Sequence, residues 1–423
     1  MRPLFPILFA AALCAASVVQ AEAPANVVTV HDPAGLMRAI ATARPPERIL
    51  LAPGDYGAIK IVNGPRLAAV FAAPLTIASA DPTNPAQLSR LTIAGARNIA
   101  IEGLKLVYGF QSGDPYWTTP FAVINSRDIT LRHNRFVGDV ARGVSAVADG
   151  HGYGMGLSVR GSDGVAVRDN DISRFMVGIR VMESANIDVT GNDIHNLRMD
   201  GMDVSQVSHI RIADNHIHAF EKAPGSKDHP DMIQFWTAGT KHPTTDVTIE
   251  NNLLDAEGDG WTQSIFMRNE LVDTHKAGPE MFYRNIVIRQ NVIINAHLHG
   301  ILVGEGNGIT ISHNTLVHDA RSDGPQANPP LWRPRIEVAK RSTDVTIEGN
   351  IAAAFPEPQP GQNWSARDNV VAQDRDPQAP GYYGQIFVNA MAGDPRDLRN
   401  FAYRKGGPAD GHRIGAAALI DPK

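Results

Sequence analysis

A short phrase recurs along the chain, and it limits the fold more than any other feature of the sequence. Each copy has a polar pair, alternating apolar residues, an asparagine and two more residues, as in RDITLRHNRF (127–136) and ANIDVTGNDI (185–194). The asparagines of the eight copies stand at positions 134, 170, 192, 215, 252, 291, 314 and 350. At the closest they are 22 or 23 residues apart, and the wider spacings leave room for inserted loops.

This repeat predicts a parallel β-solenoid. Apolar residues at every second position predict strands rather than helices. A repeat this short, with asparagine at a fixed bend, is typical of a coil whose turns stack on one another. Asparagine tolerates the left-handed backbone angles of a bend, and stacked asparagine amides can hydrogen-bond from turn to turn. We therefore expect an all-β chain with one column of asparagines along the coil.

The two ends of the repeat region differ from its middle. Residues 27–60 read as strand, amphipathic helix and strand, which would cover the apolar core and free strand edges at the N-terminal end. Residues 97–352 hold the repeated coils. Residues 360–423 lose the repeat and predict a final turn and a covering tail. We predict one domain over residues 22–423.

The first 21 residues have the pattern of a signal peptide. Arg2 precedes an apolar run, and Ala21 fits a small-residue cleavage site. The run is too short for a stable membrane span, so we expect an exported protein, periplasmic or secreted, without a membrane span. Cys14, the only cysteine, lies in this segment, so the mature chain would have no disulfide and no cysteine metal site.

The charge of the whole chain argues against one class of partner. The formal net charge is −5 and the sequence pI is near 6.3, which provides no global field for nucleic acid. We expect a monomer with no nucleic-acid partner, in which any anionic ligand is held by a local group of basic residues.

A polar column is predicted on the strands that precede the repeats. These strands align by their inward apolar pairs, from Leu157/Val159 to Ile336/Val338, and aligned residues lie about 4.8 Å apart on successive turns. Two places before the inward pair, four consecutive turns carry Asp200, Asp231, Gln263 and His299. Burying two carboxylates in an apolar coil is costly, so we expect this column to face solvent.

Three inserted loops, residues 138–155, 219–230 and 255–263, run into the same strands and are expected to wall a groove. The predicted catalytic residues are Asp200, Asp231, His229, His299, Arg268, Lys227 and Tyr153. The predicted substrate-binding residues are Arg160, Arg180, Asp203, Gln234, Trp236, Gln263, His151 and Trp261. Four histidines at or next to bends are expected to be solvated: His195, His216, His218 and His313.

These features resemble the pectate-lyase-like superfamily of right-handed parallel β-helix proteins, over nearly all of the mature chain. The phrase LAPGDY (51–56) looks most like the chondroitinase B and alginate lyase branch, whereas MDGMDV (199–204) and HG (299–300) resemble phrases of polygalacturonases. Pro230 stands where polygalacturonases have the first of two paired aspartates, which departs from their pattern. The resemblance implies a right-handed coil with an N-terminal capping helix, but it does not by itself specify an activity.

The polar residues fit β-elimination beside a uronate, which needs a neutraliser for the carboxylate, a base for the C5 proton and an acid for the leaving oxygen. The candidate neutralisers are Arg268, Gln234 and a Ca²⁺ ion held by Asp200 and Asp231. The candidate bases are His229, His299 and Lys227, and the candidate acid is Tyr153. No cofactor other than Ca²⁺ is indicated. We predict a polysaccharide lyase whose partner is an acidic polysaccharide. The alternatives are a glycoside hydrolase of polygalacturonase type, a C5 epimerase, and a polysaccharide-binding or export protein that is not an enzyme.

Overall fold

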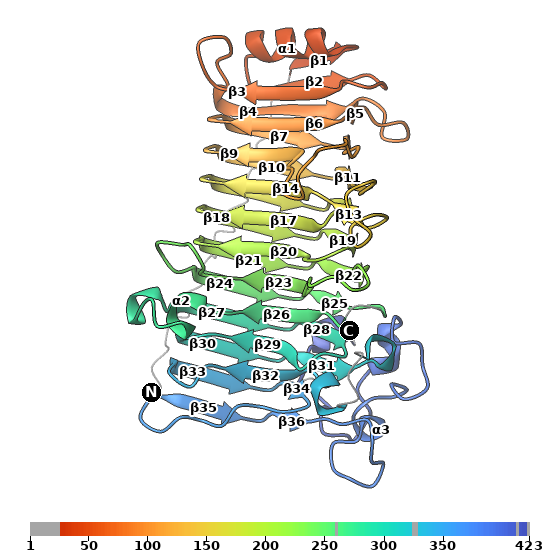
Figure 1. Cartoon of the computed structure of the whole chain (residues 1–423), viewed down its shortest axis with the longest axis vertical. Helices are drawn as coiled ribbons and strands as arrows, with labels where there is room; N and C mark the ends of the chain where they lie inside the picture. The colour runs from red at the N-terminus through yellow and green to blue at the C-terminus, as the bar shows by residue number, and fades with distance from the viewer. Residues whose placement is uncertain (1–25, 259–260, 324–328, 412–413, 421–423) are drawn as a thin grey trace, which may run out of the picture.

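The computed structural model describes residues 26–258, 261–323, 329–411 and 414–420. Within these ranges the chain forms an elongated coil of three long parallel sheets, with 13, 11 and 10 strands (Figure 1). Strands that are neighbours in space are one turn apart in sequence, so the predicted all-β parallel solenoid is confirmed. The segment predicted as a signal peptide, residues 1–21, lies outside the described residues. No helix in the described part of the chain is both long and apolar enough to cross a membrane.

The strands of the three sheets and of one hairpin have the following bounds. The 13-stranded sheet contains β1 (Asn26–Val30), β2 (Glu47–Leu51), β4 (Val70–Ser79), β7 (Arg97–Glu102), β10 (Arg127–Arg132), β15 (Asp163–Arg168), β18 (Ala185–Thr190), β21 (Ser208–Ala213), β24 (Thr245–Glu250), β27 (Tyr283–Arg289), β30 (Gly306–Ser312), β33 (Thr343–Glu348) and β35 (Trp364–Arg367). The 11-stranded sheet contains β5 (Gln87–Leu88), β8 (Lys105–Val107), β11 (Arg135–Val137), β16 (Asp171–Ser173), β19 (Asp193–Leu197), β22 (His216–Phe220), β25 (Leu253–Asp255), β28 (Val292–Asn295), β31 (Thr315–His318), β34 (Ile351–Ala352) and β36 (Val370–Val371). The 10-stranded sheet contains β3 (Ala58–Val62), β6 (Arg90–Ala94), β9 (Phe121–Ile124), β14 (Met155–Arg160), β17 (Val177–Met182), β20 (Met202–Ser205), β23 (Asp231–Phe235), β26 (Gln263–Met267), β29 (His299–Val303) and β32 (Arg335–Val338). A short hairpin joins β12 (Asp139–Val140) to β13 (Gly152–Tyr153).

The helices are short. The α-helices are α1 (Pro33–Thr42), α2 (Glu270–Asp273), α3 (Tyr383–Ile386) and α4 (Ala417–Ile420), and the 3₁₀ helices are η1 (Pro279–Met281), η2 (Ala320–Ser322), η3 (Pro329–Trp332) and η4 (Leu398–Phe401). The predicted capping helix is α1, which lies across one end of the coil (Figure 1). Asp32 caps it by accepting a hydrogen bond from the backbone N–H of Gly35, and Leu36 and Ile40 bury its apolar face.

The core is a stack of apolar side chains that alternate with outward residues. In the 10-stranded sheet Leu157 lies opposite Ile179, and the register continues through Met202 and Ile233 to Ile336, as the alignment of inward pairs predicts. All these side chains are buried. Each contributes about 1.5–3 kcal/mol of hydrophobic stabilisation.

The eight asparagines form one column, as predicted. The side-chain oxygen of Asn215 accepts hydrogen bonds from both the backbone N–H and the side-chain amide of Asn192, each at 2.9 Å. The same pair of bonds repeats from turn to turn, and Asn369 extends the column beyond Asn350. Asn369 belongs to a further turn made by β35 and β36, in which the sequence repeat is too degenerate to recognise.

The C-terminal segment packs along the outer face of the 11-stranded sheet. Its buried apolar residues, among them Tyr383, Phe387 and Phe401, form a second core with Val292 and Val317. This side of the coil is therefore covered in its last turns, and the first two inserted loops lie on earlier turns (Figure 1).

Candidate active site

Three carboxylates lie together where β20 and β23 begin. Asp200 accepts a hydrogen bond from the backbone N–H of Asp231 at 2.9 Å, and the side-chain amide of Gln234 donates to Asp231 at 2.6 Å. Asp203 on β20 pairs with Arg180 on β17 at 2.8 Å. Since these residues come from successive turns of one sheet, the solenoid alone brings them together.

The expectation that this column faces solvent is wrong for three of its four residues, whereas His299, whose side chain is 23% exposed, lines a cavity described below. Asp200 and Asp231 have no exposed surface, and Gln263, which lies opposite Asp231, is 8% exposed. Asp231 accepts a hydrogen bond from Gln234, the outward residue of β23, whereas Met232 and Ile233 pack in the main apolar core. The buried carboxylate therefore lies outside that core. The cluster lies just below the surface, since His229, whose side chain is 69% exposed, has its Nδ1 at 3.6 Å from Asp231.

A glycine allows the turns to approach at this point. Gly201 follows Asp200, and a Cβ atom there would collide with the backbone carbonyl of Met232 on the next turn. Any other residue would push the turns apart. The hydrogen bond between Asp200 and the Asp231 backbone depends on this close approach.

Burial dominates the electrostatics of the three carboxylates. It raises the pKa of Asp231 to about 6, against the lowering effect of the nearby His229 side chain. Burial and the nearby charges of Asp203 and Asp231 raise the pKa of Asp200 well above its ordinary value. Burial also raises the pKa of Asp203, which Arg180 partly offsets. The cluster therefore holds a proton more readily than exposed carboxylates do.

The cluster does not fit the Ca²⁺ ion considered for Asp200 and Asp231. One carboxylate oxygen of each aspartate lacks a hydrogen-bond partner, which by itself would suit a cation. Ca²⁺ requires six to eight converging oxygen ligands. Within the described ranges, however, these three carboxylates are not among the groups whose ligand atoms all lie within 4.8 Å of one another.

A cavity of about 480 Å³ opens on the next strands of the same sheet, β26, β29 and β32. Its wall includes Arg268, His299 and Glu337, with Phe266 and Leu302 between them. His299 and Arg268 are both predicted catalytic residues, and the cavity brings them together. A positive charge on His299 also contributes to lowering the pKa of Asp231. The cavity therefore lies close enough to the carboxylate cluster for the two to interact electrostatically.

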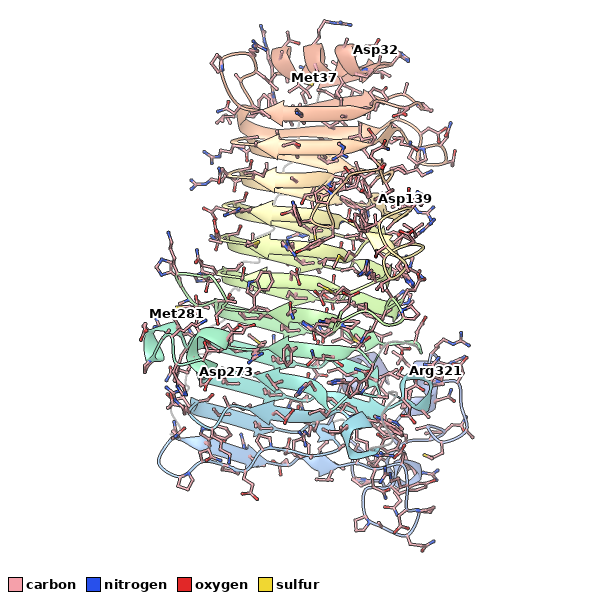
Figure 2. All side chains as sticks on the ribbon, viewed as in Figure 1. Asp32, Met37, Asp139, Asp273, Met281 and Arg321 are labelled. Carbon is pink, nitrogen blue, oxygen red and sulfur yellow. The ribbon has the colours of Figure 1, made fainter. Side chains whose placement is uncertain are left out.

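The side chains of the cavity are held by partners. His299 Nδ1 lies 2.8 Å from Glu337 Oε2, and this pairing directs Nε2 away from Glu337. Burial opposes ionisation of Glu337, but the hydrogen bond with His299 and the charge of Arg335 outweigh it, so the pKa of Glu337 is lowered. Arg268, whose side chain is 50% exposed, donates from Nε to Asp273 at 2.8 Å. Figure 2 shows Asp273, the last residue of α2, at the edge of the coil.

The other predicted residues are distributed around the two sites. Arg180 also lies over the ring of Trp236, at 6.0 Å from its centroid. The ring of Trp261 packs against that of His297 at 4.8 Å. His151 Nδ1 contacts the Glu221 carbonyl at 3.3 Å, which joins the first two inserted loops as expected for a wall.

Three predicted residues lie away from the carboxylates and the cavity wall. Tyr153 is buried with Phe110 in a small apolar cluster, so its expected role as an acid at an open groove does not agree with its position. Burial raises the pKa of its hydroxyl further. Arg160 forms a surface ion pair with Glu183, and Lys227 is exposed on its loop.

Residues that the sequence did not single out complete the site. Glu337 orients His299, and the only sequence signal for it is its outward position on the strand after His299. Arg198, 7% exposed, pairs with Asp228 at 2.9 Å and fixes the loop that carries His229. His297 is buried beside His299, and burial lowers its pKa to about 3.

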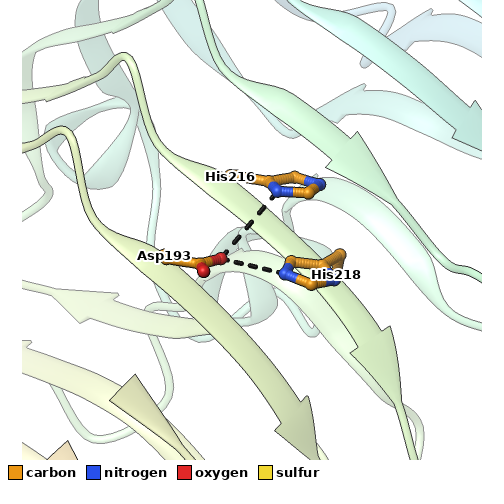
Figure 3. A group of neighbouring side chains, drawn as sticks. All are labelled: Asp193, His216 and His218. Carbon is orange, nitrogen blue, oxygen red and sulfur yellow. Dashed lines mark hydrogen bonds and ion pairs between the residues drawn. The ribbon is translucent and has the colours of Figure 1, made fainter. Parts of the chain in front are cut away.

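Three of the histidines expected to be solvated form a stacked column instead. The rings of His216 and His218 are 3.9 Å apart and nearly parallel, and His195 stacks on His218 at 5.2 Å. Asp193 lies against both His216 and His218 (Figure 3). Mainly through burial, the pKa of His216 is lowered to about 4.

Comparisons with known proteins agree with the fold. A family model described as a right-handed beta helix region matches residues 123–352, which is more than half of the 423 residues. A search of curated proteins finds no match. The match supports the right-handed coil that the sequence resemblance implies.

Several solved structures are similar over most of their length. An alginate lyase from Paenibacillus sp. str. FPU-7 is 14% identical, covers 81% of this chain and 99% of its own, and has a TM-score of 0.43. The pectate lyase Pel9A is 13% identical, with 87% and 84% covered and a TM-score of 0.43. PfbA, a surface adhesin of Streptococcus pneumoniae, is 11% identical, with 73% and 88% covered and a TM-score of 0.47. Similarity at this level does not assign an activity.

Proposed function

The chain belongs to the family of right-handed β-helix proteins, and we propose that it is an enzyme that degrades an acidic polysaccharide by β-elimination. One observation carries this proposal: a single cavity is lined by an arginine, Arg268, and by a histidine, His299, that is oriented by a carboxylate, Glu337. These are the groups that elimination beside a uronate requires. The proposal includes an exported, monomeric protein, periplasmic or secreted.

Arg268 would bind the carboxylate of the uronate. Its Nε is engaged with Asp273, but a guanidinium has five N–H donors, so the two terminal nitrogens can still make a bidentate contact. As the C5 proton leaves, negative charge builds up on the uronate carboxylate. A guanidinium in place stabilises that charge more than it stabilises the ground state.

His299 would carry the proton. With Nδ1 held by Glu337, neutral His299 accepts the C5 proton on Nε2, and the electrons of the C5–H bond form the C4–C5 double bond. The C4–O bond breaks, and the leaving oxygen takes the proton back from His299. Glu337 stabilises the positively charged ring between the two transfers, and its lowered pKa keeps it ionised for that role.

One specific observation favours a glycoside hydrolase as the second candidate. Asp231, with a pKa raised to about 6, lies beside Asp200, whose pKa is also raised. A carboxyl group whose pKa is raised toward neutrality suits the general acid that hydrolysis needs, with a second carboxyl group as its partner. Both groups are fully buried, and for that reason we place this candidate second.

The proposal is tested by incubating the protein with a panel of polyuronates and following two products together. Elimination gives new reducing ends and the ultraviolet absorbance of an unsaturated uronate. Reducing ends without that absorbance would replace the lyase proposal with the hydrolase. If neither signal appears on any polyuronate, degradation of this substrate class is refuted. His209→Gln, a change on the 13-stranded sheet, serves as the control and is expected to keep full activity.

A further inference from the structure

We propose that the outer face of the 11-stranded sheet carries a binding site for a divalent transition metal ion, with Asp193, His216 and His218 as its ligands. This site is independent of the proposed lyase activity, which uses the 10-stranded sheet. Figure 3 shows the three side chains, with Asp193 on β19 facing both histidines on β22.

Two adjacent parallel strands place these residues next to one another. His216 and His218 are two residues apart on β22, so both rings project from the same face of the strand. Asp193 lies directly opposite His216, and His195 opposite His218, on the adjacent parallel strand. The inward neighbours Ile194 and Ile217 are fully buried and fix this phase, so the sheet itself holds the ligands side by side.

The distances fit a metal ion. His218 Nε2 is 2.9 Å from Asp193 Oδ1, and His216 Nδ1 is 3.8 Å from the same oxygen. Within the described ranges this is the only group of three histidine, cysteine or acidic residues whose ligand atoms all lie within 4.8 Å of one another. In a tetrahedral zinc site, bonds of about 2.1 Å put ligand atoms roughly 3.4 Å apart. The two measured distances lie on either side of that value, so small side-chain rotations would complete the site.

A second carboxylate supports the ligand role of His218. Glu257 Oε2 lies 3.5 Å from His218 Nδ1, the nitrogen that does not face Asp193. That nitrogen is buried and has no hydrogen bond. Histidine ligands generally direct their other nitrogen to a carboxylate, which fixes the tautomer that leaves Nε2 free for the metal. A small rotation of the Glu257 side chain would make this bond.

The ligand set selects the class of ion. Two imidazoles and one carboxylate suit Zn²⁺ and its transition-metal neighbours, whereas Ca²⁺ and Mg²⁺ prefer sites made only of oxygen. Three protein ligands leave one position of a tetrahedral ion for water. The ion would join two successive turns of the coil, so its binding is expected to stabilise the fold.

Zinc chloride alone is the probe. The protein is produced without a histidine tag, stripped with a chelator and titrated calorimetrically with Zn²⁺. We expect one Zn²⁺ per chain, and a rise in Tm of about 3 °C when zinc exceeds its Kd a hundredfold. Calcium chloride is expected to produce neither effect.

In the variant with both His216→Gln and His218→Gln, zinc affinity should fall at least tenfold. His209→Gln, which removes a histidine that lies 3.7 Å from Asp246, is the matched control and should bind zinc as the wild type does.

Two results would overturn the proposal: a wild-type chain that binds no zinc, or zinc binding that survives the double substitution. Circular dichroism shows whether the double variant is folded. If it is not folded, Asp193→Asn takes its place, because that change removes the shared ligand charge while keeping the shape of the side chain. Unchanged zinc affinity in folded Asp193→Asn would equally refute the site.

Discussion

Replacing Asp231 by asparagine should make the protein more stable at neutral pH. The asparagine would keep the size of the side chain and could still accept the hydrogen bond from Gln234. It would remove a charge that the folded protein buries completely.

The magnitude follows from the shift in pKa. Burial raises the pKa of Asp231 from 3.8 to about 6, so between these pH values the folded chain binds more protons than the unfolded chain. The free energy of unfolding therefore falls as the pH rises through this window. A shift of about two units corresponds to about 3 kcal/mol. With an unfolding entropy of about 2.1 cal/mol/K per residue over roughly 400 residues, Asp231→Asn should raise Tm by about 3 °C near neutral pH.

The assay is thermal unfolding of the wild type and the variant across this pH range. The gain in Tm should be full near pH 7, should shrink as the pH falls from about 6 to 3.8, and should disappear below both pKa values, where Asp231 is protonated in the folded and unfolded states. Asp81→Asn is the control, because hydrogen bonds from Thr83 lower the pKa of Asp81 and the same replacement should bring no gain at pH 7. If Asp231→Asn lowered Tm at pH 7, the carboxylate would be a net stabilising group and the burial argument would be refuted.

Three further outcomes are expected. Arg268→Lys should reduce kcat on the active polyuronate by about 10²–10³ with little change in KM, because an ammonium group cannot reproduce the bidentate fork; a change in KM alone would contradict its role in elimination. Glu337→Gln should lower kcat by a factor of at least about ten without lowering Tm, because it removes the charge that stabilises protonated His299; full activity would refute the pairing. Asn252→Ala should destabilise the protein by about 3 kcal/mol or more in urea unfolding, since it removes the bonds of Asn252 to the backbone N–H and side-chain amide of Asn215 and to the Ile212 carbonyl, all buried; Asn369→Ala, at the less buried end of the column, should cost less.

The periodic part of the structure could be predicted from the sequence. Alternating apolar residues and the stacked asparagines set the register, so the alignment placed Ile179 beside Met202 and Asp231 beside Gln263. Each turn repeats the same local geometry, so once the residues of one column are aligned correctly, the residues of the neighbouring columns are aligned as well. The stacked histidines could also have been predicted from this alignment, because Asp193 and His216 occupy equivalent places in two copies of the repeat.

The irregular parts could not be predicted in this way. Whether neighbouring segments cover the Asp231 carboxylate depends on packing that the repeat does not encode, and we expected an exposed side chain where the structure has a buried one. Even spacing of the inward pairs would also put Pro334 opposite His299, whereas a shift of register between His299 and Ile301 puts Arg335 there. Tyr153 was assigned to a groove because its loop runs into the right strand, but the loop folds back into a small apolar cluster of its own.

The most direct test compares His299→Gln with Asp231→Asn on a polyuronate that the wild type degrades. If the cavity performs elimination, the wild type produces the unsaturated product, His299→Gln loses at least about 10² in kcat, and Asp231→Asn keeps a substantial part of the wild-type rate. If Asp231→Asn abolishes turnover while His299→Gln retains it, and the product is saturated, the buried carboxylates perform hydrolysis and the account is wrong.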